Sequence, residues 1–314
     1  MKRKMLLMVL ALFFCLLPLT ATAKSHMAVA KPLPPVVITE ELAAALTTPG
    51  VVVVDIRKVE DYKAGHIPGA VNVFYGTWAI KVGDNDNQLP ADDDLADAIG
   101  SAGIKPDSTV VVYGKVDTPP ERFNITRVAW TLKYAGVKNV SVLSGGFDKW
   151  AMCEKRAVST EAVSPKGVTY KGNFNKNIVV DKAYVLANLK KVLIVDVREP
   201  DFFNGKQKLP FVAKAARIAG AVNLPTGQVF EKFPPGADIA GCSMVFKSKD
   251  ALKTAAASVV GDDLNREIIV YCDTGKVASA WWFVLTEVLG YKNIKNYDGS
   301  AQEWMKDDTA PIEP

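Results

Sequence analysis

The sequence predicts an α/β protein of two tandem domains, each a parallel β-sheet flanked by helices on both faces. The first observation is an internal repeat that covers most of the chain. The second is that short all-apolar runs alternate with stretches of helical periodicity in each repeat, which indicates strands buried on both faces. The third is size, because 314 residues with 49% hydrophobic content can form two cores of ordinary size.

The repeat consists of five sequence blocks that recur in the same order, which makes chance an unsatisfactory explanation. The distance between paired blocks grows along the chain, so insertions lie between them. The pairs are 51–57 with 192–198, 69–72 with 220–223, 110–113 with 268–271, 134–140 with 288–294, and 144–150 with 298–304.

The same pattern places the individual elements. We expect domains over residues 36–150 and 177–305. Residues 151–176 between them contain Pro165 and Gly167 among many polar side chains, which is typical of a linker. The expected helices are 40–46, 95–102, 122–134, 182–189, 250–260 and 278–289.

Residues 1–23 have the pattern of a cleaved export signal. Three basic residues at positions 2–4 precede an apolar stretch over 5–19, and small residues at Ala21 and Ala23 suit cleavage after Ala23. The apolar stretch is shorter than the ~20 residues that a membrane-spanning helix needs, which disfavours an anchor. We therefore expect a periplasmic or secreted protein.

Cleavage would change both the charge and the cysteine count. Loss of three basic residues and no acidic ones lowers the net charge from +4 to +1, so we expect no nucleic-acid partner and no membrane partner. Loss of Cys15 leaves Cys153, Cys242 and Cys272. An odd number leaves at least one cysteine unpaired within the chain. Cys153 and Cys242 are either a disulfide or two inert thiols.

Cys272 is the candidate nucleophile. It ends the apolar run 268–271 and opens a short loop that leads into a helix. A strand, a glycine-containing loop and a helix in succession aim backbone N–H groups at the sulfur, and the helix dipole adds partial positive charge. Both effects favour the thiolate, so we expect a reactive cysteine. The residues of the expected active-site loop are Asp273, Thr274, Gly275, Lys276, Val277 and Ala278.

The surroundings of Cys272 narrow its chemistry. Both histidines, His26 and His66, precede the second repeat, which disfavours a Cys–His hydrolase. The chain has no Cys-x-x-Cys pair, no P-loop and no convincing Gly-x-Gly-x-x-Gly motif, so we expect neither a metal nor a cofactor. A Cys-x5-Arg phosphatase would need arginine at Ala278. Lys276 is the nearby cation: it stabilises a thiolate or, as the alternative, points to solvent.

Four motifs together resemble the rhodanese family. They are Asp-x-Arg after a strand, Gly-His-Ile-Pro-Gly-Ala at 65–70, Cys-x-x-Gly at 272–275, and Asp-Gly-Ser-x-x-Glu-Trp at 298–304. The duplicated layout resembles the tandem-domain thiosulfate and 3-mercaptopyruvate sulfurtransferases, in an exported bacterial form. The resemblance covers nearly all of the chain after residue 35 and implies two rhodanese-like domains.

The resemblance also implies an activity. A sulfurtransferase of this kind would move sulfane sulfur from thiosulfate or a related anionic donor to cyanide or a thiol, through a persulfide on Cys272. A periplasmic redox partner is a further candidate. The amino-terminal domain would be catalytically silent, and the sequence supports this, because Gly114 stands at the position that matches Cys272 and the loop after it carries Pro119 and Pro120.

Departures from the family pattern concern the substrate contacts. Phe202 stands where long rhodaneses tend to place a substrate-binding arginine, and Val277 where relatives often carry arginine or threonine. Candidate contacts are Arg198 and Arg217, the latter in an insertion over 204–219. The alternatives are that Arg198 braces the sheet edge and that the insertion is a solvated loop. The second functional hypothesis is a carrier of persulfide or oxyanions without small-molecule turnover.

Overall fold

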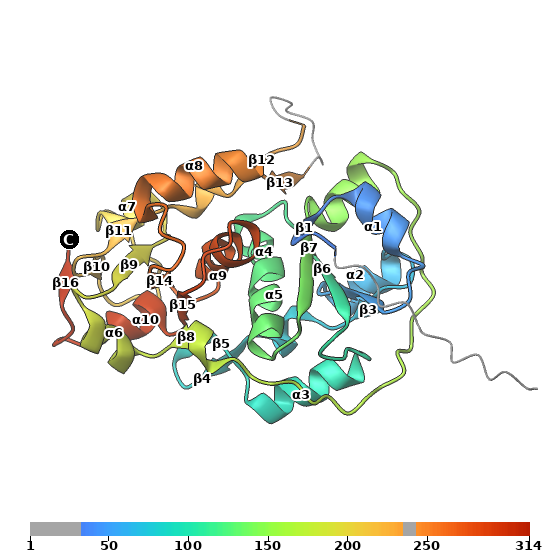
Figure 1. Cartoon of the computed structure of the whole chain (residues 1–314), viewed down its shortest axis with the longest axis horizontal. Helices are drawn as coiled ribbons and strands as arrows, with labels where there is room; N and C mark the ends of the chain where they lie inside the picture. The colour runs from blue at the N-terminus through green and yellow to red at the C-terminus, as the bar shows by residue number, and fades with distance from the viewer. Residues whose placement is uncertain (1–32, 235–242) are drawn as a thin grey trace, which may run out of the picture.

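The computed structural model describes residues 33–234 and 243–314, and within them it contains two five-stranded parallel sheets (Figure 1). The prediction of a duplicated α/β fold is confirmed. In the first sheet the strand order is β1-β7-β6-β2-β3, and all neighbours pair in parallel. The strands are β1 (Val36–Val37), β2 (Val51–Asp55), β3 (Val71–Asn72), β6 (Thr109–Tyr113) and β7 (Asn139–Leu143).

The second sheet repeats this topology. Read from its β8 edge, its order is β8-β15-β14-β9-β11, again parallel throughout, so each strand matches one of the first sheet. The central position of β6 is taken by β14. The strands are β8 (Val179–Val180), β9 (Leu193–Asp196), β11 (Val222–Asn223), β14 (Ile268–Tyr271) and β15 (Ile294–Tyr297).

The helices lie close to the expected ranges, with two differences. The helix expected over 122–134 is split at Phe123 into α4 and α5, and the one expected over 278–289 becomes a π-helix from Val284, where Leu289 N–H bonds five residues back to the Val284 carbonyl. The α-helices are α1 (Thr39–Ala45), α2 (Val59–Ala64), α3 (Asp92–Ser101), α4 (Pro119–Arg122), α5 (Asn124–Tyr134), α6 (Lys182–Asn188), α7 (Pro200–Phe203), α8 (Lys249–Val260), α9 (Ala278–Phe283) and α10 (Ser300–Trp304). The other helical turns are η1 (Tyr75–Thr77), η2 (Asp148–Cys153), η3 (Lys176–Ile178), η4 (Thr226–Gln228) and η5 (Val284–Val288).

The two domains share one hydrophobic core. Helices α5 and α9 lie side by side between the two sheets (Figure 1), and the cluster of buried residues there runs continuously from one domain into the other. Two smaller clusters cover the outer faces of the sheets. Trp130 of α5 and Trp281 of α9 are both fully buried in the shared core. The central layer therefore fixes the position of one domain against the other.

Three short antiparallel pairs of strands lie outside the two parallel sheets among the described residues. The pair β4 (Ile80–Val82) and β5 (Asn85–Gln88) belongs to the first domain but reaches the second, where Asp86 N–H donates to Gln302 Oε1 at 2.8 Å. The remaining pairs are β12 (Phe230–Lys232) with β13 (Met244–Phe246) and β10 (Arg217–Ile218) with β16 (Ile312–Glu313).

The segment after η2 runs along the first domain. Ser159 exchanges two backbone hydrogen bonds with His66, and the Tyr170 hydroxyl donates to the Ala135 carbonyl at 2.8 Å. The connection between the sheets is thus bound to the first domain over much of its length.

A buried ion pair joins the domains at the centre. Arg127 of α5 donates from Nη1 and Nη2 to the carboxylate of Asp298, which follows β15, at 2.5 and 3.2 Å. The Arg127 side chain is fully buried and that of Asp298 is 10% exposed.

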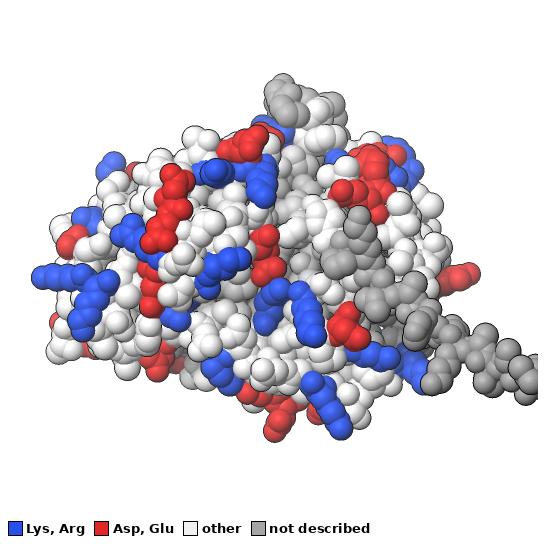
Figure 2. Space-filling view, viewed as in Figure 1, with Lys and Arg blue, Asp and Glu red and all other residues white. Residues whose placement is uncertain are grey.

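Charged side chains of both signs are interspersed on the face shown in Figure 2. Among the described residues, no helix is long and apolar enough to cross a membrane. The proposed signal segment lies outside the described residues.

We expect Arg127→Leu to lower the free energy of unfolding by about 3–5 kcal/mol, because it leaves the Asp298 carboxylate buried without its partner. Urea denaturation followed by tryptophan fluorescence measures the change. The control is Arg266→Leu, since Arg266 is exposed and its guanidinium bonds only to the Val260 carbonyl among the described residues. We expect that variant to stay within about 0.5 kcal/mol of the parent protein. Equal losses in the two variants would contradict the role given to the ion pair.

Candidate active site

Cys272 lies at the carboxyl end of β14, the central strand of the second sheet. Ligands of open parallel α/β sheets bind at this edge, where the loops after the strands meet. The Cys272 side chain is fully buried, and its backbone N–H donates to the Ser300 Oγ at 3.2 Å. Cys272, the candidate nucleophile, is therefore held at the end of a buried strand rather than on a free loop.

The loop after Cys272 forms a cradle of N–H groups, as the sequence predicts. The backbone N–H groups of Thr274, Val277 and Ala278 lower the pKa of the Cys272 thiol, as donors directed at the sulfur do. Gly275 makes the tight curve possible, because its φ is +72° and an added Cβ would lie 2.6 Å from the Asp298 carbonyl oxygen. No residue with a side chain fits there without displacing Asp298.

The sequence predicts that Cys272 favours the thiolate form, and this prediction is wrong for the resting protein. Burial raises the pKa of the Cys272 thiol, and the neighbouring Asp273 carboxylate raises it further, whereas the N–H groups lower it. The sequence shows which N–H groups surround the sulfur, but it does not show how completely the fold removes water from it. The resting cysteine therefore favours the neutral thiol more than an exposed cysteine does.

Arg198 braces the sheet edge, which was the alternative given for it. Its Nε and Nη2 donate to the Asp196 carboxylate at distances between 2.6 and 3.1 Å, and Nη2 also donates to the Ala216 carbonyl. The Tyr271 hydroxyl bonds to the same carboxylate at 2.7 Å. The Arg198 Nη1 is buried without a hydrogen bond and lies 3.6 Å from Asp273 Oδ1, so Arg198 reaches the active-site loop through an ion pair.

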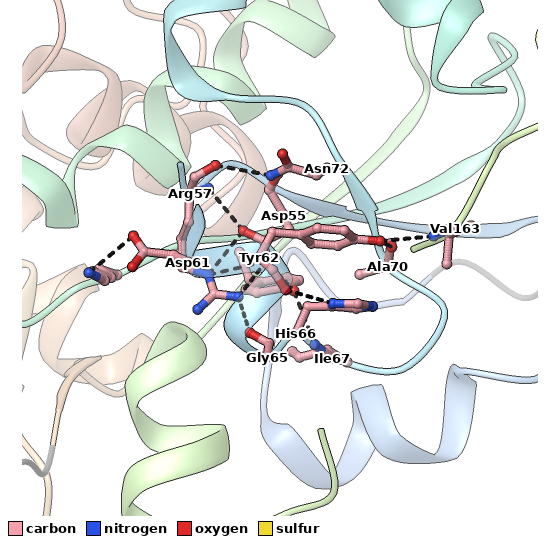
Figure 3. A network of polar contacts seen from close by, with 12 residues as sticks. Asp55, Arg57, Asp61, Tyr62, Gly65, His66, Ile67, Ala70, Asn72 and Val163 are labelled. Carbon is pink, nitrogen blue, oxygen red and sulfur yellow. Dashed lines mark hydrogen bonds and ion pairs between the residues drawn. The ribbon is translucent and has the colours of Figure 1, made fainter. Parts of the chain in front are cut away.

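The first domain contains the same network, shown in Figure 3. Arg57 donates from Nε and Nη2 to Asp55 and from Nη2 to the Gly65 carbonyl, and the Tyr113 hydroxyl donates to Asp55 at 2.6 Å. Asn72 links the two ends of this turn by bonding to the Asp55 and Arg57 carbonyls. The repeat found in the sequence is thus a repeat of hydrogen bonds as well as of strands.

Gly114 of the first domain occupies the position of Cys272, but without room for a side chain. An added Cβ would lie 2.9 Å from Cγ1 of Ile56. A cysteine here would have to displace a buried residue of the first core.

Lys276 does not point to solvent. Its Nζ donates to the Pro120 carbonyl at 2.9 Å and lies 5.6 Å from the centre of the Tyr75 ring. Burial lowers the pKa of Lys276, while the charge of Cys272 raises it. Since this interaction is mutual, the Lys276 ammonium favours the Cys272 thiolate.

Residues of the first domain complete the site, and sequence reasoning missed them. Asn87 Nδ2 donates to Thr274 Oγ1 at 3.1 Å, and the Tyr75 hydroxyl donates to Asn87 Oδ1 at 2.8 Å. Asn87 has a φ of +57°, a left-handed conformation in which asparagine is enriched. Arg127 bonds to Asp298, the residue that packs against Gly275 of the loop, and so supports the loop from behind. No local signal marks these residues, because they come from the other repeat.

A cavity of about 320 Å³ opens against the loop between the two domains. The second domain contributes the loop residues Asp273 and Val277 and the braced Arg198. The lining residues are Pro119, Arg122, Phe123, Arg198, Glu199, Phe202, Thr226, Gly227, Phe230, Met244, Asp273 and Val277. A small molecule in this cavity would contact Asp273 and Val277 of the loop, whereas the buried Cys272 does not line it.

The structure does not bring Arg217 to this cavity. Its guanidinium donates to Glu313 Oε2 at 3.1 Å and bonds to the Phe203 and Pro314 carbonyls, so it ties β10 to the C-terminal strand β16. In the insertion over 204–219, Lys214 pairs with Asp308 at 2.8 Å. Cys153 ends η2, whereas Cys242 lies outside the described residues, so both alternatives, a disulfide and two inert thiols, stay open.

The chain has two domains built on the same α/β sheet, and the central strand of the second sheet leads into a cysteine surrounded by backbone N–H groups. These features define a tandem-domain thiol protein. The family model for the rhodanese-like domain matches residues 39–153 and 180–307. The chain therefore belongs to the rhodanese family and carries two such domains.

Similar proteins include named sulfur-transfer proteins. The "Putative thiosulfate sulfurtransferase" of Mycolicibacterium smegmatis is 32% identical over 291 residues, which are 88% of this chain and 96% of that protein. The "Sulfur carrier protein TtuD" of Thermus thermophilus is 32% identical over 259 residues, which are 77% of this chain and 83% of that protein. These names and the fold place the chain in the sulfurtransferase family.

Solved structures agree on the fold. SseA from Escherichia coli, described as a 3-mercaptopyruvate sulfotransferase, has a TM-score of 0.69 at 26% identity and covers 85% of this chain and 99% of its own. The anaerobic ergothioneine biosynthesis enzyme from Chlorobium limicola has a TM-score of 0.69 at 24% identity. This chain spans only 64% of that enzyme's length, with 84% of itself covered, and the likeness is one of fold.

We expect charge changes on the two sides of Cys272 to move its pKa in opposite directions. Asp273→Asn should lower the thiol pKa by removing a negative neighbour, and Lys276→Ala should raise it by removing a positive one. Burial raises the pKa of Asp273 to about 6, so its effect should be present above pH 6 and fade below it. The pH dependence of the Cys272 alkylation rate measures both changes.

This titration uses protein in which Cys153 and Cys242 are serine, so that alkylation reports Cys272. Asp201→Asn is the matched control, because Asp201 is exposed on α7 and pairs with Lys206. Its midpoint should equal that of the parent. Shifts of the same sign in both loop variants would refute this electrostatic picture.

Proposed function

We propose that the protein is a sulfurtransferase that moves sulfane sulfur from thiosulfate or a related anionic donor to cyanide or a thiol. The observation that carries the proposal is the set of N–H groups around the Cys272 sulfur, beside a cavity lined by Asp273 and Val277 of the same loop. Backbone N–H groups aimed at one point stabilise negative charge that develops there during a reaction. The cradle suits a sulfur atom that gains and loses charge in each cycle.

The transfer has two steps. The Cys272 thiolate attacks the outer sulfur of thiosulfate, a new S–S bond forms, and sulfite leaves with the electron pair of the broken S–S bond. Cyanide then attacks the outer sulfur of the persulfide, thiocyanate leaves, and the electron pair returns to Cys272 as thiolate. The N–H groups of Thr274, Val277 and Ala278 stabilise the thiolate in both steps. In the proposal the first domain catalyses neither step.

A carrier function is the second candidate, and the burial of Cys272 favours it. A persulfide on a fully buried sulfur is shielded from solvent, which suits transport to a protein partner. The similarity to the sulfur carrier protein of Thermus thermophilus points the same way. The partner would be a periplasmic protein with a reactive thiol.

We expect Cys272→Ser to abolish thiocyanate formation from thiosulfate and cyanide, because serine cannot form a persulfide. Cys153→Ser is the control and should retain activity, since Cys153 lies at the end of η2 in the other domain. Activity that survives in Cys272→Ser would rule out the proposed nucleophile.

Intact mass spectrometry separates the enzyme from the carrier. An enzyme shows many turnovers with small molecules, whereas a carrier gains the mass of one sulfur atom and keeps it until a protein acceptor is added.

We also propose that residues 1–23 direct export and are removed after Ala23. The support is the basic start, the apolar stretch and the small residues near Ala23. We expect the protein from a periplasmic extract to begin at Lys24 when its N-terminal peptide is sequenced. A variant without residues 5–19 should remain in the cytoplasm, and full-length protein found there in both cases would contradict export.

A further inference from the structure

The cavity at the active-site loop holds two arginines, and only one is free to bind a ligand. Arg198 is bound to Asp196 through three hydrogen bonds, and its remaining Nη1 is buried beside Asp273. Its positive charge is thus offset by two carboxylates from its own domain. Removing Arg198 from these partners would expose buried negative charge, so it does not serve as a mobile anion contact.

Arg122, the other arginine, comes from α4 of the first domain. Its Nε donates to the Val116 carbonyl at 2.9 Å and its Nη2 to the Asp117 carbonyl at 3.2 Å. Two backbone carbonyls therefore fix the plane of the guanidinium. Its Nη1 donates no hydrogen bond, and Arg122 pairs with no carboxylate, among the described residues.

The surroundings of Arg122 leave its charge available. Its guanidinium carbon lies 5.7 Å from the centre of the Phe230 ring, and Phe202 and Met244 line the same cavity. Burial lowers the pKa of Arg122, but arginine remains charged at any neutral pH. A cation held against an apolar wall, with unused N–H donors, binds an oxyanion more strongly than a fully hydrated one does.

The position of the segment also suits this role. Two residues before Arg122, the Pro120 carbonyl accepts the bond from Lys276, so α4 contacts the active-site loop directly. Next to Arg122, the Phe123 ring packs edge-on against Phe230 at 5.8 Å. The loop of the first domain is therefore a wall of the second domain's site.

We propose that Arg122 of the first domain is the residue that binds the anionic head of the sulfur donor and makes the site selective for donors with an oxyanion group, such as a sulfonate or a carboxylate. This role rests on the sulfurtransferase function proposed above and deepens it. The silent domain takes part in substrate binding through this residue.

The test compares a donor that has an oxyanion group with one that has none. In steady-state assays with cyanide, thiosulfate is the first donor. An alkyl hydropersulfide is the second: Cys272 attacks its outer sulfur, a persulfide forms, and the alkyl thiolate leaves with the electron pair of the broken S–S bond. We expect Arg122→Gln to raise the KM for thiosulfate roughly ten- to hundredfold, the value of one charge-assisted hydrogen bond. The KM for the hydropersulfide should change less than about twofold. Arg122→Lys should lie between the parent and Arg122→Gln, because lysine retains the charge but not the fixed plane.

The matched control is Arg266→Gln, an exposed arginine of the second domain that bonds to the Val260 carbonyl. It should leave both KM values unchanged. Equal increases for the two donors in Arg122→Gln would mean that the residue only shapes the cavity, and an unchanged thiosulfate KM would mean that it does not contact the donor. Either result overturns the role of Arg122 while the transfer function stands. If neither donor forms a persulfide on Cys272 in the parent protein, both proposals fail together.

Discussion

The buried ion pair between Arg127 and Asp298 is the contact on which the geometry of the active site depends. Asp298 lies directly behind Gly275, so close that the glycine has no room for a side chain. The same carboxylate accepts the N–H of Leu89, next to the β4–β5 pair of the first domain. Burying two charges costs free energy unless both are well bonded, and here the bonds come from different domains. The active-site loop is thus shaped by the domain interface as much as by its own sequence.

The duplication explains why one domain can serve the other. Both sheets end in the same Asp–Arg–Tyr network, so both edges are equally rigid before any chemistry is added. What differs is the residue after the central strand, Gly114 in one and Cys272 in the other. Without a cysteine at this position, the loop of the first domain is free to pack against the loop of the second. The hydrogen bond from Lys276 to the Pro120 carbonyl shows that this loop packs against the loop that follows Cys272.

The sequence was enough to predict the fold and the position of Cys272 at the end of the central strand, because both follow from patterns local to the chain. Repeated apolar runs define the two sheets, and a strand, glycine and helix in succession define the loop around Cys272. For Arg198 the sequence left two roles open, substrate contact and brace, and the hydrogen bonds to Asp196 support the brace. The sign of the pKa shift did not follow from the sequence, since it depends on burial. The contribution of Asn87 could not be predicted either, because its bond to Thr274 spans 187 residues of sequence.

The arginine that braces the sheet edge contacts the loop after the central strand in only one of the two domains. In the second, Arg198 extends past Asp196 to Asp273, the residue next to Cys272, and so holds a carboxylate beside the sulfur. In the first domain the matching position is Lys115, which turns to Asp61 on α2 instead. The carboxylate opposes the thiolate at rest, whereas the N–H groups favour it. The protonation of the Cys272 thiol is therefore set by burial and by two opposed neighbours, the Asp273 carboxylate and the N–H groups, and Arg198 fixes the first of these neighbours in place.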